Sequence, residues 1–120
     1  MKIAISSRGE DLGSEVDARF GRARYFIVYD TDSDSYEVIE NIQNLNAMQG
    51  AGIQSASNVV QCGVEYVLTG HCGPKAFRTL TEAGIKVVVG VEGTVGDAVE
   101  KFKKGEYKPV EEPDVESHWV

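Results

Sequence analysis

Two short apolar segments, 64–69 and 85–89, constrain the fold of this chain more than any other feature. Both are rich in β-branched residues and poor in charge, as strands buried on both faces are. The segment between them has helical spacing from Pro74 to Gly84, with proline at its first position. A strand–helix–strand unit of this length requires parallel strands joined by a right-handed crossover. The sequence therefore predicts an α/β fold.

The other segments extend this unit. Strand patterns occupy 2–7, 25–29 and 36–40, and the last two flank an Asp- and Ser-rich turn that makes them an antiparallel hairpin. Helical spacing marks 51–62 and a segment after Thr94, which begins like a capping box. The economical arrangement is a mixed five-stranded sheet in the order 3-2-1-4-5, with strand 2 antiparallel and helices on its faces.

Length and charge limit the function classes. The chain has 120 residues, the size of one domain, and we expect a domain over 1–106 followed by an acidic, loosely ordered tail over 107–120. Its net charge of −7 disfavours nucleic acid, whose binding uses Lys and Arg contacts to phosphate. No segment reaches the roughly 18 apolar residues of a membrane span, and the N-terminus is typical of a strand rather than a signal peptide. We therefore expect a cytoplasmic protein that binds neither nucleic acid nor membrane.

The loops after the parallel strands of this sheet would open at one edge. They are 8–22, 41–50, 70–73 and 90–94, and they hold most of the glycine and asparagine of the domain. Open α/β sheets bind ligands at the carboxyl ends of their strands. The glycine spacing after the last strand matches neither the dinucleotide-binding nor the P-loop signature. We therefore expect a binding site of another kind at this edge.

The loop at 70–73 carries the residues most typical of a metal site. His71 is a candidate ligand through a neutral ring nitrogen, or else a solvent-facing loop histidine. Cys72 precedes the predicted helix N-terminus, which should lower the thiol pKa and favour thiolate; the alternative is a small, half-buried loop residue. Cys62 is typical of packing at a helix end, and no Cys-x-x-Cys pair indicates a zinc ribbon. Two neighbouring ligands do not make a metal site by themselves.

Neighbouring loops offer groups that suit an anionic ligand. Arg19 and Arg22 have fork-shaped guanidinium groups that fit carboxylates or the periphery of a metal cluster, although nearby acidic residues could pair with them instead. Phe20, between them, is expected to plug the core. Asn44 could donate a hydrogen bond to a ligand or only support a turn. The backbone near Gly73, at the start of a helix, favours negative charge.

Four motifs together resemble a known family. They are Asp17-Ala18-Arg19-Phe20-Gly21-Arg22, Gly50-Ala51-Gly52, Gly70-His71-Cys72-Gly73-Pro74 and Ala83-Gly84-Ile85. In this order they are similar to the dinitrogenase iron–molybdenum cofactor biosynthesis domain, also called the nitrogenase accessory factor family, over roughly residues 1–105. The resemblance implies a ribonuclease H-like fold with the strand order given above. It also implies binding of iron–sulfur or iron–molybdenum cluster precursors, with His71 and Cys72 as the metal ligands.

Three hypotheses follow from these observations. The first is a non-catalytic carrier with a transiently bound cluster, held by His71 and Cys72 as metal ligands. Its partners would be metallocluster donor or acceptor proteins, and the chain itself a monomer or weak homodimer. The second is a binding module for a small anionic metabolite or a partner protein at the same loop edge. The third, a nuclease, rests on fold analogy alone. In the first hypothesis, that of a cluster carrier, the residues that contact the cofactor in addition to the metal ligands would be Arg19, Arg22, Asn44 and Gly73.

Overall fold

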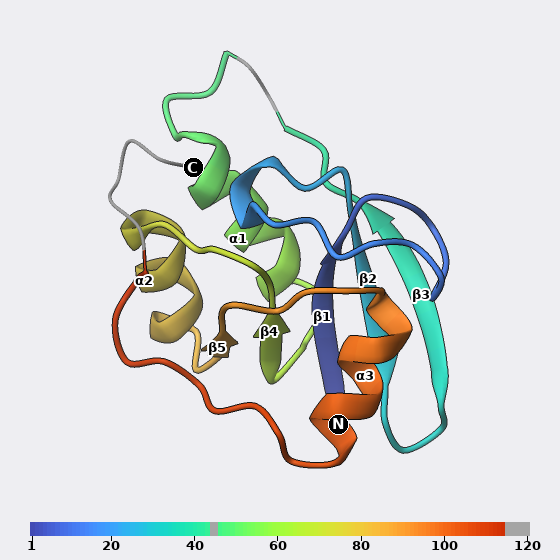
Figure 1. Ribbon diagram of the computed structural model, residues 1–120. Coiled ribbons are helices and arrows are strands. Elements are labelled where there is room, and N and C mark those ends of the chain that lie inside the picture. The colour runs from blue at the N-terminus through green and yellow to red at the C-terminus, as the bar shows by residue number, and fades with distance from the viewer. Residues whose placement is uncertain (44–45, 115–120) are drawn as a thin grey trace.

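The computed structural model describes residues 1–43 and 46–114. These residues form a five-stranded sheet in the order β3-β2-β1-β4-β5, with three α-helices and one 3₁₀-helix, η1 (Figure 1). β2 is antiparallel to its neighbours β1 and β3, whereas β1, β4 and β5 are parallel. The predicted topology is confirmed. The elements are β1 (Lys2–Ser7), η1 (Phe20–Arg22), β2 (Tyr25–Asp30), β3 (Ser35–Glu40), α1 (Ala51–Val60), β4 (Tyr66–Leu68), α2 (Pro74–Glu82), β5 (Lys86–Val88) and α3 (Val95–Lys103).

Different helices cover the two faces of the sheet. α1 and α2 lie on one face and α3 on the other (Figure 1). In β4, Val67 belongs to the core cluster between the sheet and helices α1 and α2, and Leu68 belongs to the core cluster between the sheet and α3. Successive strand residues face opposite sides of a sheet, so a strand covered on both sides has to be apolar throughout. This explains the continuous apolar runs in the sequence.

Local signals set the ends of the helices. Pro74 is the first residue of α2, and Gly84, with φ of +82°, follows its end. At α3 the Thr94 hydroxyl accepts from the Asp97 N–H, and the Asp97 carboxylate accepts from the Thr94 N–H. The predicted capping box is therefore confirmed, with aspartate in the place of the more usual glutamate.

The segment after α3 runs beside β5 toward α2 (Figure 1). Val110 donates its N–H to Val87 O at 2.8 Å, and its side chain packs against the core on the α1 and α2 side. β5 is an edge strand, so its outer backbone groups are open to such pairing. The tail that we expected to be loosely ordered therefore contacts the sheet at Val110.

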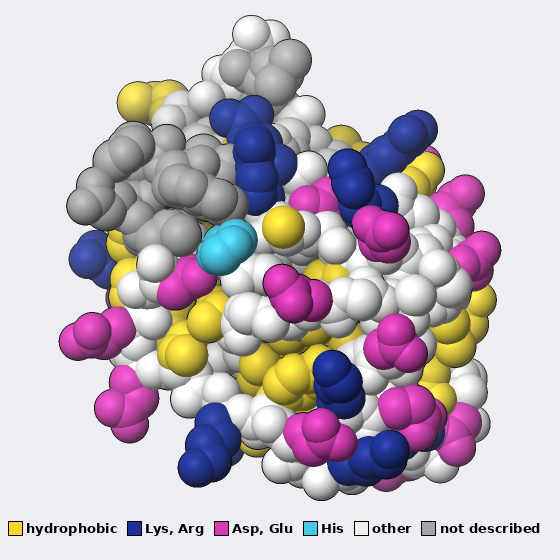
Figure 2. Space-filling view, in the orientation of Figure 1, with side chains coloured by type: hydrophobic (Ala, Val, Ile, Leu, Met, Phe, Trp, Pro, Cys, Tyr) yellow, Lys and Arg dark blue, Asp and Glu magenta, His cyan; other side chains and the backbone are white. Residues whose placement is uncertain are grey.

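The surface mixes both signs of charge. Figure 2 shows acidic and basic side chains interspersed on one face of the molecule, with apolar surface exposed between them. In the part of the chain that the structure describes, no helix has the length and apolar character needed to span a bilayer.

Candidate functional site

Of the loops after β1, β3, β4 and β5, which the sequence predicts to share one edge of the sheet, those after β1, β4 and β5 meet there. A parallel β-bridge joins Arg19 to His71, which places the first loop beside the loop after β4. The Val16 N–H donates to Gly93 O at 2.9 Å and ties the first loop to the loop after β5. Three segments distant in sequence are thus held together by backbone contacts.

Close approach at this edge requires a glycine. A Cβ atom on Gly70 would lie 2.6 Å from Ala18 O and 2.7 Å from Ala18 Cα, so no side chain fits there. Beneath this contact, the buried Ser6 Oγ is hydrogen-bonded to Asp17 O and to Thr69 Oγ1, both at 2.8 Å. These bonds fasten the first loop to the ends of β1 and β4.

The first loop contains η1, a short helix that sequence reasoning missed. Phe20 is 1% exposed, and its ring centroid lies 5.1 Å from that of Phe26, which confirms its predicted role as a plug. Arg19 and Arg22 are exposed on either side of it. Anchoring Phe20 in the core therefore leaves both arginines at the surface, with the Arg19 backbone paired to that of His71.

A polar clamp holds η1 against α1. Gln43 Nε2 donates to Gly21 O at 3.0 Å and to Ser55 Oγ at 2.9 Å, and the Ser55 hydroxyl also donates to Gly21 O at 3.1 Å. A Cβ on Gly21 would lie 3.1 Å from Gly52 Cα, so the two backbones are in contact. Sequence reasoning missed Gln43 and Ser55. The one available signal was a serine on the apolar face of a predicted helix.

The first turns of α1 and α2 border a pocket at the same edge. Their N-cap residues, Gly50 and Gly73, have no side chain to cap the first N–H groups. Such helix N-termini favour anions. Gly73, which the sequence predicts as a contact, is one of the residues that line this pocket. The pocket has a volume of about 120 Å³ and is lined by Gly50, Ala51, Gly52, Ile53, Gly73, Pro74, Lys75 and Ala76.

Cys72 lies in the core rather than at the surface of this edge. It is 1% exposed and belongs to the same cluster as Phe20 and Ala76. Burial, and secondarily the charge of Asp114, raises the pKa of the Cys72 thiol from its ordinary value of 9.0 to about 12. The prediction of a lowered pKa was wrong, because the loss of water around a thiolate outweighs the nearby helix N-terminus. Cys72 is a protonated thiol at neutral pH.

Cys62 has the structural role that its position indicated. It follows the end of α1, is half-buried and packs against the core on the α1 and α2 side. Burial raises its pKa as well. Neither free cysteine is therefore an activated thiolate in this conformation.

His71 contacts the C-terminal segment. Its Nδ1 lies 2.8 Å from Asp114 Oδ2, and the two side chains are 42% and 26% exposed. The other carboxylate oxygen, Asp114 Oδ1, accepts from the Cys72 N–H at 2.9 Å. Sequence reasoning missed Asp114, because it lies 42 residues from Cys72 and no local pattern links the two.

The structure brings Arg19, His71, Cys72 and Gly73 to one region, but only some of these groups are accessible. Asn44 lies outside the described residues, and Asn46, further along its loop, is exposed. Among residues 1–43 and 46–114, no three His, Cys, Asp or Glu side chains are grouped so that they could hold a metal ion.

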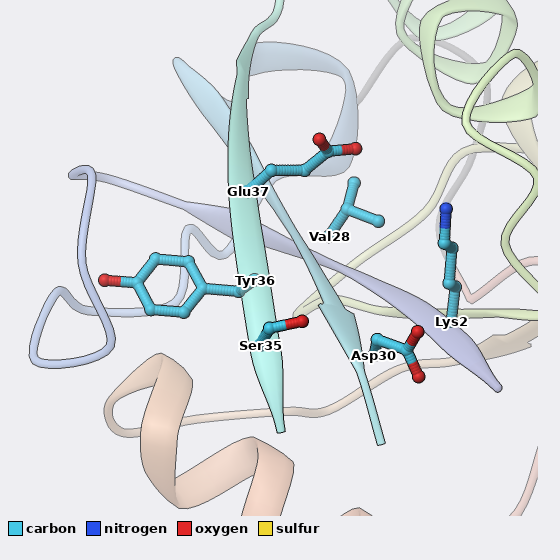
Figure 3. Close-up of a pocket in the computed structure, with 6 residues that line it drawn as sticks. All are labelled: Lys2, Val28, Asp30, Ser35, Tyr36 and Glu37. Atoms are coloured by element: carbon cyan, nitrogen blue, oxygen red, sulfur yellow. The ribbon is translucent and has the colours of Figure 1, made fainter. Parts of the chain in front are cut away.

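Another pocket, of about 280 Å³, lies at the opposite end of β1 (Figure 3). Figure 3 shows the Lys2 and Glu37 side chains on either side of Val28, with Tyr36 pointing away from them. The lining of this second pocket contains no histidine or cysteine and includes none of the predicted site residues. It is lined by Lys2, Val28, Asp30, Ser35, Tyr36 and Glu37.

Comparison with known proteins agrees with the fold and the loop motifs. The chain is similar to the apo form of the orange protein (ORP) from Desulfovibrio gigas, with 38% identity, a TM-score of 0.89, and coverage of 95% of this chain and 96% of that one. It is also similar to the NMR structure of a NifB-like protein from Thermotoga, with 41% identity, a TM-score of 0.76, and coverage of 90% and 91%. An uncharacterized protein of Methanocaldococcus jannaschii is 28% identical over 114 residues, which is 92% of each chain.

The sequence profile of the family described as dinitrogenase iron-molybdenum cofactor matches residues 1–105. This range contains all five strands and three α-helices of the described residues, together with the loop edge on which the predicted site lies. The chain therefore belongs to the dinitrogenase iron-molybdenum cofactor family.

Proposed function

We propose that this chain binds and carries precursors of iron–sulfur or iron–molybdenum type clusters, and that it does not itself catalyse a reaction. One observation carries the proposal: Arg19, His71 and the uncapped first turn of α2 meet at one edge of the sheet. Membership of the family and the likeness to the apo form of the orange protein support it.

The chemistry of the edge suits an anionic cargo. Guanidinium groups such as those of Arg19 and Arg22 bind anionic surfaces through several N–H donors at once. The backbone N–H groups at the start of α2 favour negative charge without any side chain. His71 adds a ring nitrogen that can coordinate iron or molybdenum. In this proposal the cluster is cargo, held by charge and hydrogen bonds as much as by coordination.

Cys72 takes part only after a movement. A thiol that is 1% exposed, with its pKa raised to about 12, cannot ligate a cluster while it is packed in the core. Ligation by Cys72 would require the loop 70–73 to leave its contact with Ala18 and the thiol to lose its proton. His71 is therefore the first ligand of the predicted pair, and Cys72 the second.

Carriage implies exchange with other proteins. We propose that metallocluster donor and acceptor proteins approach this same edge, and that the chain acts as a monomer or weak homodimer in the cytoplasm. An open edge suits release, because exposed ligands can be exchanged without unfolding the protein.

Anaerobic reconstitution with ferrous iron and sulfide tests the proposal. The wild-type protein should develop visible charge-transfer absorption and retain iron through gel filtration. Combining His71→Ala with Cys72→Ala should abolish both signals, whereas Cys62→Ala, which removes the half-buried cysteine away from the edge, should leave both intact. Full retention of the cluster by the double variant would refute the ligand assignment.

The buried thiol favours one further candidate, a module that binds a small anionic metabolite without metal. The same arginines and helix N-terminus would hold a carboxylate or phosphate, and the protonated Cys72 would stay in the core. Thermal unfolding with and without phosphate and a set of dicarboxylates distinguishes the two. Stabilisation by one of these anions that persists in Cys72→Ala, together with no iron uptake, would select the metabolite module.

A further inference from the structure

The contact between His71 and Asp114 defines the chemistry of the histidine ring. Nδ1 of His71 and Oδ2 of Asp114 are 2.8 Å apart, a normal hydrogen-bond distance. An ionised carboxylate can only accept hydrogen bonds, so the proton in this contact belongs to Nδ1. In the neutral ring, Nε2 is then the nitrogen that carries the lone pair.

The carboxylate is itself held in place from two sides. Asp114 Oδ1 accepts from the Cys72 N–H at 2.9 Å, so the carboxylate bridges two consecutive residues of the loop. Its own segment is attached to β5 by the bond from the Val110 N–H to Val87 O at 2.8 Å. Asp114 is therefore placed by the sheet edge and the loop together, and the ring orientation of His71 is fixed as a consequence.

We propose that Asp114 is a positioning residue for the site, which holds His71 in the tautomer and orientation that present Nε2 to the metal of the cargo. This inference rests on the proposed function and extends it to the C-terminal segment. A histidine that ligates a metal usually donates its other ring N–H to a carboxylate or carbonyl, and the partner makes the ligating nitrogen more basic.

The position of Asp114 also allows a second role, with the opposite effect on cargo binding, and an experiment can distinguish the two roles. The Asp114 carboxylate lies beside an edge that suits anions, so it could compete with an anionic cargo for the Cys72 N–H. Removing a competitor would strengthen cargo binding, whereas removing a positioning residue weakens it. The hydrogen bond from His71 Nδ1 to Asp114 favours the positioning role. Competition for the Cys72 N–H involves only the other carboxylate oxygen and would not require a contact with the histidine ring.

The first experiment measures the tautomer of His71 in the protein without cargo. Long-range proton–nitrogen NMR correlations distinguish a ring protonated at Nδ1 from one protonated at Nε2, and a His71→Gln variant identifies the resonances, since the chain has two histidines. We expect the Nδ1–H tautomer in the wild type, its loss in Asp114→Ala, and its recovery in Asp114→Glu. Glu112→Gln, which removes the same charge two residues away, should leave it unchanged.

The second experiment follows cluster loss from the reconstituted protein to an iron chelator. We expect Asp114→Ala to lose iron about tenfold faster than the wild type, the lower end of the effect that is usual for such outer-shell partners. Asp114→Glu should restore slow loss, and Glu112→Gln should match the wild type. Because Asp114 belongs to neither cluster of the hydrophobic core, thermal unfolding should show that all these variants remain folded.

The outcomes separate this inference from the function on which it rests. A wild type that holds a cluster, together with an Asp114→Ala variant that loses it at the same rate or more slowly, overturns the positioning role alone. An unchanged His71 tautomer in Asp114→Ala does the same. A wild type that takes up no cluster overturns the proposed function, and the positioning role with it.

Discussion

At the scale of the residue, Cys72 shows two opposite influences on one thiol. A position beside a helix N-terminus stabilises a thiolate, and burial in an apolar core destabilises it. Here burial prevails, because the side chain is 1% exposed and Asp114 adds a negative charge nearby. The neutral thiol stabilises the fold at ordinary pH, and the residue is not poised for reaction.

The raised pKa predicts how stability changes at alkaline pH. The unfolded chain releases the Cys72 proton near pH 9.0, but the folded chain retains it up to about pH 12. The contribution of the protonated Cys72 thiol to the free energy of unfolding is therefore complete below pH 9. It is lost as pH rises toward 12, at about 1.4 kcal/mol per pH unit. Urea unfolding at several pH values should show this loss in the wild type, and Cys62→Ala should keep the part that is due to Cys72, because it removes only the alkaline loss that comes from the raised pKa of Cys62. Cys72→Ala should lose stability less steeply than either protein, and a slope in Cys72→Ala equal to that of the wild type would contradict the assignment.

At the scale of the element, the starts of α2 and α3 differ in a way that matters for function. Thr94 and Asp97 satisfy the first N–H groups of α3 with their own side chains. α2 begins after Gly73, which has no side chain to do this, so its first turn is open to an external acceptor. The helix that is capped is therefore structural, and the uncapped one borders the candidate site.

Removing the cap should weaken α3 without touching the site. Thr94→Ala loses the acceptor for the Asp97 N–H and should lower the free energy of unfolding by about 1 kcal/mol. Chemical denaturation measures the change. Thr79→Ala is a matched control, because the Thr79 hydroxyl only donates to Lys75 O within α2 and caps nothing. An equal loss in both variants would show that the effect is not one of capping.

At the scale of the whole molecule, a buried polar network connects the sheet to the loop edge. Ser6 in β1 and Thr69 after β4 are both fully buried, and they bond to each other and, through Ser6, to Asp17 O in the first loop. Buried hydroxyls are costly unless they are paired. The network therefore stabilises the one arrangement in which the first loop lies over the end of β4.

A double-mutant cycle tests this connection. Ser6→Ala and Thr69→Val should each lower the free energy of unfolding by about 1–3 kcal/mol, because each leaves a buried partner unsatisfied. The double variant should lose less than the sum, since the pair is removed together. Urea denaturation gives the four free energies. Strict additivity would mean that the two hydroxyls stabilise the protein independently.

Much of the fold could be predicted from the sequence because its signals are local. Continuous apolar runs marked β4 and β5, proline marked the start of α2, and the Asp- and Ser-rich turn marked the hairpin. The boundaries of the elements differ from the prediction: α1 ends at Val60, two residues before the predicted end, and β4 and β5 are shorter than their apolar runs. Strand ends depend on which backbone groups find partners, which composition does not specify.

The candidate site was predicted only in part. The meeting of Arg19 with His71 followed from the strand order, because loops after parallel strands share an edge. The clamp formed by Gln43 and Ser55 did not follow from the strand order, because it joins a loop to a helix through side chains that share no sequence pattern. Asp114 was missed for the same reason, as its contacts lie across more than forty residues of chain.

The sequence by itself determined the order of strands and helices, the edge at which the loops gather and the family, because these depend on local periodicity and short motifs. Only the tertiary structure decided which of the gathered groups are accessible. It buried the Cys72 thiol and left His71 at the surface beside Asp114. The reason is physical: exposure and pKa depend on all the atoms within a few ångströms of a group, and most of those atoms belong to residues far away in the chain.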